Sequence, residues 1–416
     1  MENTLQQQGR AAREASHVLA TAGTEKKNEA LEAIASVLTD RQEEWLSANA
    51  QDLEAAERAG MRPALIDRLR LTPERIAGIV EGIRQIIVLP DPIGRVDKME
   101  TRPNGLIIGR RRVPLGVIAI IFEARPNVTV DAAALCLKSG NVCILRGGRE
   151  AIHSNRCAAK LMREALAQAG LPGDCISLVQ DTRRETANEL MHLDEYVDVL
   201  IPRGGAGLIR TVAKEASVPV IRTGEGICHI YVDNEADMDM AARILYNAKC
   251  SRPSVCNAAE CVLVHREAAE GFWEKALPLL DGREVELRAD KPGMEILGAR
   301  ALPASEEDWD TEYGDYILAV RTVENLEEAI EFINAHGTGH SECIVTADYF
   351  KAQRFLDAVD AAAVYVNAST RFTDGGEFGL GAEIGISTQK MHARGPMGLE
   401  ELTSYKYVIY GEGQLR

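Results

Sequence analysis

The sequence predicts an α/β protein with two domains, each built on a parallel β-sheet. The first observation is the length of 416 residues, which leaves room for two or three domains at roughly 100–200 residues each. The second is that short apolar segments alternate with helical segments between residues 113 and 223. The third is a similar alternating stretch that begins at about residue 226. Short apolar strands that alternate with helices are typical of doubly wound parallel sheets.

The chain before residue 90 is expected to be helical. Two apolar stripes with helical spacing are Leu31, Ile34, Ala35 and Leu38, and Ile76, Ile79, Val80 and Ile83. Thr72 is expected to cap the second of these helices, which Pro73 and Glu74 would begin. We interpret both stripes as core faces and not as binding sites.

A β-hairpin is expected next, because Asn104-Gly105 is a strong hairpin-turn signal. Its two strands would be 96–102 and 106–113, with three consecutive arginines at 110–112 on the returning strand. Two interpretations of this hairpin stay open. It is either a solvated basic edge that discourages aggregation or an arm that contacts another subunit.

The alternating stretch that follows is expected to form the first parallel sheet. Its strands would be Val117–Phe122, Val142–Leu145, Ile176–Val179, Val197–Ile201 and Val218–Ile221. Its helices would include Asp131–Lys138, Ser154–Ala169 and Gly207–Ala216. Ligands of such sheets bind beyond the carboxyl ends of the strands, so the turns after these strands are the places to search for a site.

The second sheet is expected to contain five strands. They are Ile230–Asp233, Cys261–His265, Tyr316–Val320, Cys343–Thr346 and Ala363–Asn367. The segment 404–410 near the end of the chain is β-prone on both faces. A terminal strand with two apolar faces needs cover, and a partner subunit could provide it.

Charge and composition exclude several classes of protein. The chain has 63 acidic residues against 47 Lys and Arg, a net charge of −16, whereas nucleic acids and anionic membranes select basic surfaces. The apolar run 113–122 is too short to span a bilayer, and the N-terminal residues contain no apolar signal segment. The nine cysteines form no paired framework. We therefore expect a cytoplasmic protein with reduced thiols.

Two glycine turns are candidates for anion binding. Arg146-Gly147-Gly148 and Arg203-Gly204-Gly205 each join an expected strand to a helix. Glycines at such turns let the backbone approach a phosphate at the N-terminus of the helix, and the arginine adds positive charge. The alternative is that both are tight turns whose arginines are merely solvated.

Cys256 is the thiol that stands apart from the others. It lies in a segment opened by Pro253, between a helix and a strand, whereas most other cysteines lie inside apolar patterns. Positive charge or a helix dipole can activate such a thiol as a nucleophile. Cys250, Cys256, Cys261 and His265 lack the close Cys pair of zinc sites. No metal site is therefore expected.

Four segments resemble the aldehyde dehydrogenase superfamily and, within it, the γ-glutamyl phosphate reductase family. They are Val113–Gly148, Asn247–Glu260, Val323–Thr346 and Thr370–Gly411, and they cover most of the chain in order. The resemblance implies an aldehyde-dehydrogenase-like fold with a Rossmann-type domain for the cofactor, formed by 1–97 and 114–225. It further implies a catalytic domain at 226–393 and a β oligomerisation arm formed by 98–113 and 394–416. A homo-oligomer is therefore expected.

The resemblance also assigns roles to individual residues. Cys256 matches the catalytic nucleophile, and Asn127 matches the asparagine of the oxyanion hole. The residues matched to the cofactor site are Arg146, Gly147, Gly204, Gly205 and Glu312. The candidates for binding the substrate are Arg252 and Arg371.

The activity that the resemblance implies is NADPH-dependent reduction of L-glutamyl 5-phosphate to L-glutamate 5-semialdehyde in proline biosynthesis. Oxidative members carry a glutamate that activates water, and Thr223 stands at that position here. This difference favours reduction of an acyl group. Two alternatives stay open, an NAD-dependent aldehyde oxidation and a silent member that only binds ligands. The choice between NADPH and NADH is also open, as is transient contact with the glutamate 5-kinase that makes the unstable substrate.

Overall fold

The computed structural model describes residues 4–123 and 125–416, which form two compact units. Unit 1 comprises Met1–Thr223, Gly379–Gly385 and Met397–Arg416, and unit 2 comprises Gly224–Phe378 and Ile386–Pro396. Residues 1–3 of the predicted first domain and Ala124 of the run 113–148 lie outside the described residues. The functions assigned to the predicted domain ranges stay predictions.

The chain between residues 379 and 397 alternates between the two units because of its backbone pairing. Strands β14 (Ile386–Ser387) and β15 (Gly395–Pro396) pair with each other within unit 2. Met397 instead exchanges backbone hydrogen bonds with Ile384 and Gly385 within unit 1. The predicted boundary between 393 and 394 does not show this alternation.

The sheet of unit 1 is parallel and has four strands in the order β5-β4-β3-β6. They are β3 (Val117–Phe122), β4 (Val142–Arg146), β5 (Ile176–Leu178) and β6 (Val199–Arg203). The fifth predicted strand, Val218–Ile221, is wrong, because it makes only an isolated bridge between Leu200 and Val220. Pro219 lies within that segment and has no N–H to donate to a longer ladder.

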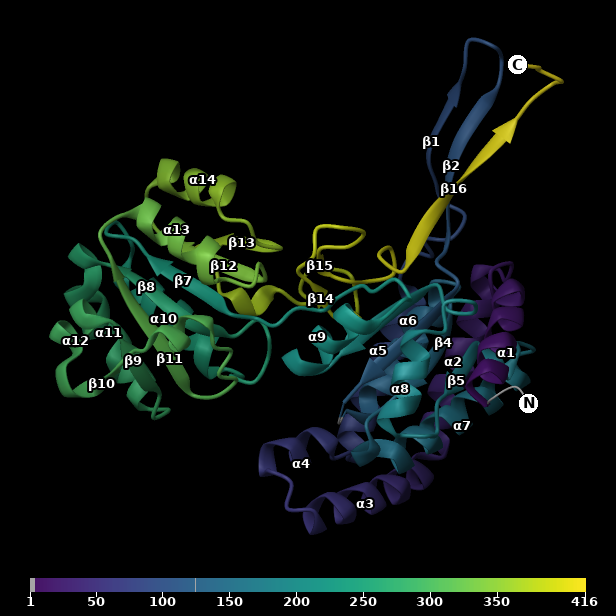
Figure 1. Ribbon diagram of the computed structural model, residues 1–416, viewed down its shortest axis with the longest axis horizontal. Helices are drawn as coiled ribbons and strands as arrows, with labels where there is room; N and C mark the ends of the chain where they lie inside the picture. Colours follow the sequence, from purple (N-terminus) through teal and green to yellow (C-terminus); the bar gives the residue numbers. More distant parts are fainter. Residues whose placement is uncertain (1–3, 124) are drawn as a thin grey trace. The chain divides into compact units, whose positions relative to one another are not determined.

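Helices surround this sheet (Figure 1). They are α1 (Thr4–Leu19), α2 (Thr24–Asp40), α3 (Gln42–Arg58), α4 (Pro63–Leu69), α5 (Pro73–Val88), α6 (Pro126–Lys138), α7 (Ile152–Gln168), α8 (Arg184–Met191) and α9 (Ala206–Glu215). Of these, α1, α6, α7 and α9 pack directly on its strands. The predicted stripe of α2 is buried, and Ile76, Val80 and Ile83 of α5 are buried as well. The Thr72 hydroxyl accepts a hydrogen bond from the Arg75 backbone at 3.2 Å, so the predicted cap is confirmed.

A separate antiparallel sheet of unit 1 contains the predicted hairpin (Figure 1). Its strands β1 (Val96–Thr101), β2 (Ile107–Pro114) and β16 (Thr403–Tyr410) lie in the order β1-β2-β16. The turn bends at Gly105, whose φ of 88° suits glycine. Several large side chains of β16 are exposed, namely Tyr405, Tyr407, Ile409 and Tyr410. This is the apolar terminal strand that the sequence predicts.

The sheet of unit 2 is parallel and has seven strands in the order β10-β9-β11-β8-β7-β12-β13. They are β7 (Cys228–Val232), β8 (Ala259–His265), β9 (Glu286–Ala289), β10 (Ala301–Pro303), β11 (Ile317–Val323), β12 (Ser341–Val345) and β13 (Ala363–Val366). The five predicted strands are present. The strands β9 and β10 were not predicted, because β9 carries Glu286 and Arg288 among its four residues and β10 has three residues that end with Pro303.

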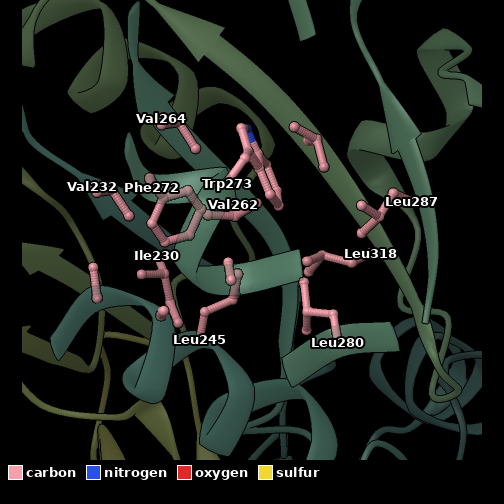
Figure 2. Packing of buried hydrophobic residues seen from close by; sticks show 14 of the residues in the cluster. Ile230, Val232, Leu245, Val262, Val264, Phe272, Trp273, Leu280, Leu287 and Leu318 are labelled. Carbon is pink, nitrogen blue, oxygen red and sulfur yellow. The ribbon is translucent and has the colours of Figure 1, made fainter. Parts of the chain in front are cut away.

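The helices of unit 2 bury their apolar faces against this sheet. They are α10 (Met238–Cys250), α11 (Ala269–Asp281), α12 (Lys291–Leu297), α13 (Leu326–His336) and α14 (Tyr349–Ala358). Figure 2 shows Phe272 and Trp273 of α11 against Val262 of the sheet. The two aromatic rings meet edge to face, with centroids 4.9 Å apart. This rigid core supports the segment that follows α10.

Two further observations concern the helices and the cysteines. Within 4–123 and 125–416, no helix is long and apolar enough to cross a membrane. All nine cysteines are free thiols in the structure.

Candidate active site

Cys256 lies on a short irregular segment between α10 and β8 in unit 2. The segment begins where α10 ends at Cys250, and Pro253 within it disfavours continuation of the helix. The Cys256 side chain is half-buried. A thiol on a turn at the edge of a rigid sheet is accessible while its backbone is fixed.

Two contacts hold the backbone of Cys256 in unit 2. A side chain at Gly226 would place its Cβ only 1.4 Å from the Cys256 carbonyl oxygen, so this close approach requires glycine. The Cys228 thiol donates a hydrogen bond to the same oxygen at 3.2 Å. Burial raises the pKa of Cys228 well above its usual range, which keeps this donor protonated.

The neighbouring thiol Cys250 has a different environment. It is 2% exposed and belongs to the core cluster under α10. Burial raises its pKa, which makes it a poor nucleophile. No group of three or more His, Cys, Asp and Glu side chains among the described residues could hold a metal ion. Of these two thiols, Cys250 is thus buried, whereas Cys256 is half-buried.

Arg371 and Arg252, the candidates for binding the substrate, both lie near the Cys256 segment in unit 2. The Arg371 guanidinium donates to the Asn257 side chain and, at 3.1 Å, to the Ser251 hydroxyl. Asn257 in turn donates to the backbone carbonyls of Arg371 and Thr373, at 3.2 and 2.9 Å. Burial and then the positive charge of Arg252 lower the pKa of Arg371. The two guanidinium groups thus form a local concentration of positive charge.

Glu312 follows a short 3-10 helix and lies on the exposed loop before β11. Its carboxylate accepts a hydrogen bond from the Gly226 backbone N–H at 3.1 Å. Gly226 is also the residue packed against the Cys256 carbonyl. Glu312 and Cys256 are therefore connected through one glycine within unit 2.

A buried ion pair supports the loop that carries Glu312. Lys249 at the end of α10 and Glu260 in β8 are joined at 2.6 Å, and at most 1% of either side chain is exposed. The other Glu260 oxygen accepts from the Gly314 backbone N–H at 3.1 Å. The Tyr313 ring lies 5.3 Å from the Arg288 guanidinium and donates its hydroxyl to Asp308 at 2.7 Å. The loop is thus held at Tyr313 and at Gly314.

In unit 1, the predicted cofactor residues lie at the carboxyl edge of the four-stranded sheet. Ile121 of β3 is opposite both Arg146 of β4 and Pro202 of β6, so the turns after the three strands share one edge. The Arg146 guanidinium donates to the Thr182 carbonyl at 2.7 Å, while its buried Nε has no hydrogen-bond partner within residues 4–123 and 125–416. Gly147 follows in the turn and is packed against the Asn155 side chain.

The turn Gly204-Gly205 begins helix α9 and binds an anion that the chain itself supplies. The Gly205 backbone N–H donates to the Glu123 carboxylate at 2.9 Å. A Cβ at Gly204 would lie 2.5 Å from the same carboxylate. The N-terminus of α9 therefore attracts negative charge, as its dipole and free N–H groups predict.

Asn127 is the second residue of α6 and follows β3 at the same edge. Its side-chain amide donates to the Asp131 carboxylate, one turn further along the helix, at 2.8 Å. Loss of hydration raises the pKa of Asp131 to about 6, although the Asn127 hydrogen bond and the charge of Arg203 oppose this. Asn127 thus presents its amide beside a carboxylate.

Thr223 ends the first segment of unit 1 and is 3% exposed. Its hydroxyl donates to the Pro202 carbonyl at 2.7 Å. This hydroxyl is engaged within the fold and has no basic group to offer to a water molecule.

The structure thus gathers the predicted residues into two groups. Unit 2 holds Cys256, Glu312, Arg252 and Arg371, and unit 1 holds Asn127, Arg146, Gly147, Gly204 and Gly205.

Sequence reasoning missed Cys228, Asp131 and the pair formed by Lys249 and Glu260. The sequence contains one indication of the ion pair, because Lys249 and Glu260 both interrupt apolar patterns. The sequence contains no such indication for Cys228, because a cysteine in an apolar strand is ordinarily part of the core.

Comparisons with known proteins give the same family along the chain. The sequence profile of the Aldehyde dehydrogenase family matches residues 2–291 and 306–408. The Gamma-glutamyl phosphate reductase of Enterococcus faecalis is 58% identical over 412 residues, 99% of each chain. The protein of the same name from Carboxydothermus hydrogenoformans is 58% identical over 405 residues, 97% of each chain.

Solved structures agree with this assignment. The crystal structure of Gamma-glutamyl phosphate reductase from Thermotoga maritima is 47% identical, covers 100% of both chains and has a TM-score of 0.97. An acetylating aldehyde dehydrogenase from Geobacillus thermoglucosidasius is 18% identical with a TM-score of 0.72 and covers 99% of this chain and 97% of its own, which shows the shared fold alone. The chain therefore belongs to the aldehyde dehydrogenase family and, within it, to the gamma-glutamyl phosphate reductases.

Proposed function

We propose that this chain reduces L-glutamyl 5-phosphate to L-glutamate 5-semialdehyde and phosphate, with NADPH as reductant and a thioester on Cys256, as a step of proline biosynthesis. The observation that carries the proposal is the near-complete similarity, at 55–58% identity, to relatives named Gamma-glutamyl phosphate reductase. The site adds support through the chemistry of its individual residues.

Cys256 is the proposed nucleophile. Its thiolate attacks the acyl carbon of the substrate, the bond from that carbon to the phosphate oxygen breaks, and phosphate leaves with a proton from solvent. The positive charge of Arg252 and Arg371 in the same unit favours both the thiolate and an anionic substrate. Arg252 and Arg371 are also the groups that we assign to the substrate's α-carboxylate.

Asn127 is the proposed donor to the oxyanion. When the thiolate adds to the acyl carbon, the carbonyl oxygen becomes negative, and the Asn127 amide and the Cys256 backbone N–H would stabilise it. One such donor contributes about 3–4 kcal/mol to lowering the barrier. The same donors serve the thiohemiacetal oxyanion, which expels the Cys256 thiolate to give the aldehyde.

The nicotinamide cofactor supplies the hydride that reduces the thioester. The residues of unit 1 fit a dinucleotide, because the N-terminus of α9 already binds a carboxylate at Gly205. Gly204 and Gly205 would hold the pyrophosphate of such a cofactor in place of the Glu123 carboxylate. We assign Arg146 and Gly147 to the cofactor ribose, Glu312 to the nicotinamide ribose, and Arg146 or Arg149 to the 2′-phosphate that distinguishes NADPH.

Aldehyde oxidation is the alternative activity, and it needs a base that activates water to hydrolyse the thioester. Thr223 stands where oxidative members carry glutamate, and its buried hydroxyl is bonded to Pro202. Acyl reduction needs no such base, because hydride removes the thioester. This contrast favours the reductive direction.

The reverse reaction tests the proposed function directly. Purified protein, glutamate 5-semialdehyde and NADP are mixed with and without inorganic phosphate, and NADPH absorbance is followed. We expect NADPH to form only with phosphate, because phosphate must release the acyl group from Cys256. Equal rates without phosphate would mean that water accepts the acyl group, and the reductive assignment would then be wrong.

Gly226→Ala is expected to lower kcat about 100-fold. The added methyl collides with the Cys256 carbonyl and must displace the reacting residue. A displacement of about 1 Å at a reacting group lowers the rate by about this factor. The phosphate-dependent assay measures the loss, and circular dichroism checks the fold. The matched control is Gly271→Ala on α11, where the nearest atom to the added Cβ lies at 3.9 Å. Full activity of Gly226→Ala would show that the Cys256 backbone need not be fixed.

We also propose that the chain forms a homo-oligomer through β16. The support is the row of exposed Tyr405, Tyr407, Ile409 and Tyr410 on a sheet of only three strands. Such surfaces are usually covered by a partner. Light scattering on the purified protein measures the mass in solution, and the mass of a single chain would refute the proposal.

A further inference from the structure

Asp131 is a charged group beside the proposed oxyanion donor that the mechanism does not yet use. It lies on α6 one turn after Asn127 and is partly buried. A carboxylate can accept about four hydrogen bonds. Among the described residues its carboxylate accepts one, from the Asn127 amide at 2.8 Å, and forms no ion pair.

An ionised carboxylate in this partly buried position has an unfavourable free energy unless a cation pairs with it. Partial burial disfavours the charged form and raises the pKa of Asp131 to about 6. The positive charge of Arg203 at the end of β6 lowers the pKa of Asp131, but not enough to offset the effect of burial. A positive ligand group within hydrogen-bonding distance of Asp131 would remove this cost.

The proposed substrate carries such a group. Its α-ammonium is four bonds from the acyl carbon, a reach of about 5 Å when the chain is extended. The Asn127 amide nitrogen and an Asp131 carboxylate oxygen are 2.8 Å apart, so two ligand atoms that each hydrogen-bond to one of them at about 3 Å can lie about 5 Å from each other. If Asn127 donates to the acyl oxygen, Asp131 is therefore at the right distance for the ammonium.

We propose that Asp131 binds the α-ammonium group of the substrate and makes the enzyme specific for α-amino acyl groups. This inference rests on the proposed function, because it takes the contact of Asn127 with the acyl oxygen from it. The alternative role for Asp131 is only to orient the Asn127 amide.

Two substrates separate these roles in the reverse assay. Glutamate 5-semialdehyde carries the amine, and 5-oxopentanoate is the same aldehyde without it. We expect Asp131→Asn to lower kcat/KM for glutamate 5-semialdehyde by about 10- to 100-fold, as loss of a charged hydrogen bond predicts. The value for 5-oxopentanoate should change less than about threefold, because the new amide oxygen still accepts from Asn127.

Each variant is compared with the wild type on the same substrate, which cancels differences in the amount of free aldehyde. Asp131→Ala removes the acceptor for Asn127 as well, so both substrates should then react more slowly. Asp40→Asn at the exposed end of α2 is the control for loss of a negative charge. Cofactor binding followed by NADPH fluorescence confirms that each variant is folded.

Equal losses on both substrates in Asp131→Asn, or no loss on either, would overturn the assignment. Failure of the proposed function looks different, because the wild type itself would then show no phosphate-dependent reaction with glutamate 5-semialdehyde. The two failures are therefore distinguishable in one series of assays.

The pH dependence gives a second readout. The carboxylate form of Asp131 is required, and its pKa is about 6, so the attraction is lost as the pH falls through that value. The ratio of kcat/KM for glutamate 5-semialdehyde between the wild type and Asp131→Asn should therefore decrease between pH 7 and pH 5, where the amine stays protonated. Both proteins receive the same substrate solution at each pH, so the amount of free aldehyde cancels in this ratio. A ratio that is independent of pH would contradict the assignment.

Discussion

Replacement of Cys256 by alanine is expected to lower the rate of phosphate-dependent NADPH formation by at least about 10³-fold. Because the proposed thioester forms on Cys256, removal of its thiol abolishes that intermediate. The loss of activity is measured through the NADPH absorbance in a mixture of glutamate 5-semialdehyde, NADP and phosphate. Binding of NADPH, measured by its fluorescence, should be retained, because the assigned cofactor residues are untouched.

Cys250→Ala is the matched control, since Cys250 is the other thiol adjacent to this segment. It is 2% exposed in the core under α10, and burial raises its pKa. Its removal should leave kcat within about threefold of the wild type, apart from a loss of stability of about 1 kcal/mol for the deleted atom. If Cys250→Ala were inactive and Cys256→Ala active, the nucleophile would be Cys250. If both were active, no thioester would be part of the reaction.

The strands that the sequence predicts best are those with the strongest apolar runs. Val117–Phe122 is six consecutive apolar residues, and the structure has β3 with these limits and all six side chains buried. The hairpin followed from Asn104-Gly105, because few turns other than hairpin turns favour that pair. The errors have equally local causes. Val218–Ile221 contains a proline, β9 carries two charged residues among its four, and β10 ends with Pro303 after only two other residues.

The site is less predictable than the fold, because its geometry depends on contacts between distant segments. Cys256 and Asn127 could be singled out through their motifs. The approach of Gly226 to Cys256 and the hydrogen bond from Cys228 connect residues about 30 positions apart. Nothing in the local pattern indicates such a contact. The environment of Asp131 depends in the same way on which strand lies beside α6.

Lys249→Met is expected to destabilise unit 2 by about 3–5 kcal/mol, the usual consequence of leaving one member of a buried ion pair alone. Lys249 and Glu260 are at most 1% exposed, so water cannot replace the missing partner. For a domain of this size, about 3 kcal/mol corresponds to a fall in melting temperature of about 6–12 °C. Differential scanning calorimetry at pH 8 measures this shift.

The matched control is Lys275→Met, which removes the lysine of an exposed pair with Asp239 on α10 and α11. Exposed pairs contribute less than about 1 kcal/mol, so its melting temperature should change by less than about 3 °C. Equal shifts in the two variants would contradict the argument, because burial would then have no consequence. The double variant Lys249→Met with Glu260→Gln should recover part of the loss, since it removes the unpaired charge.

The pH dependence of Lys249→Met follows from the carboxyl group that remains. Burial already raises the pKa of Glu260 to about 7, with Lys249 opposing the rise, so loss of Lys249 must raise it further. A carboxyl group whose pKa is higher in the folded state binds its proton more tightly there, and stability falls as the pH rises from about 4.5 through the folded pKa. The loss of stability of the variant relative to the wild type should therefore be smaller at pH 5 than at pH 8.

Because Glu260 also accepts from the Gly314 N–H beside Glu312, the KM for NADP should rise at pH 8 even where the variant is fully folded. A normal KM there would show that the buried pair stabilises unit 2 without positioning Glu312.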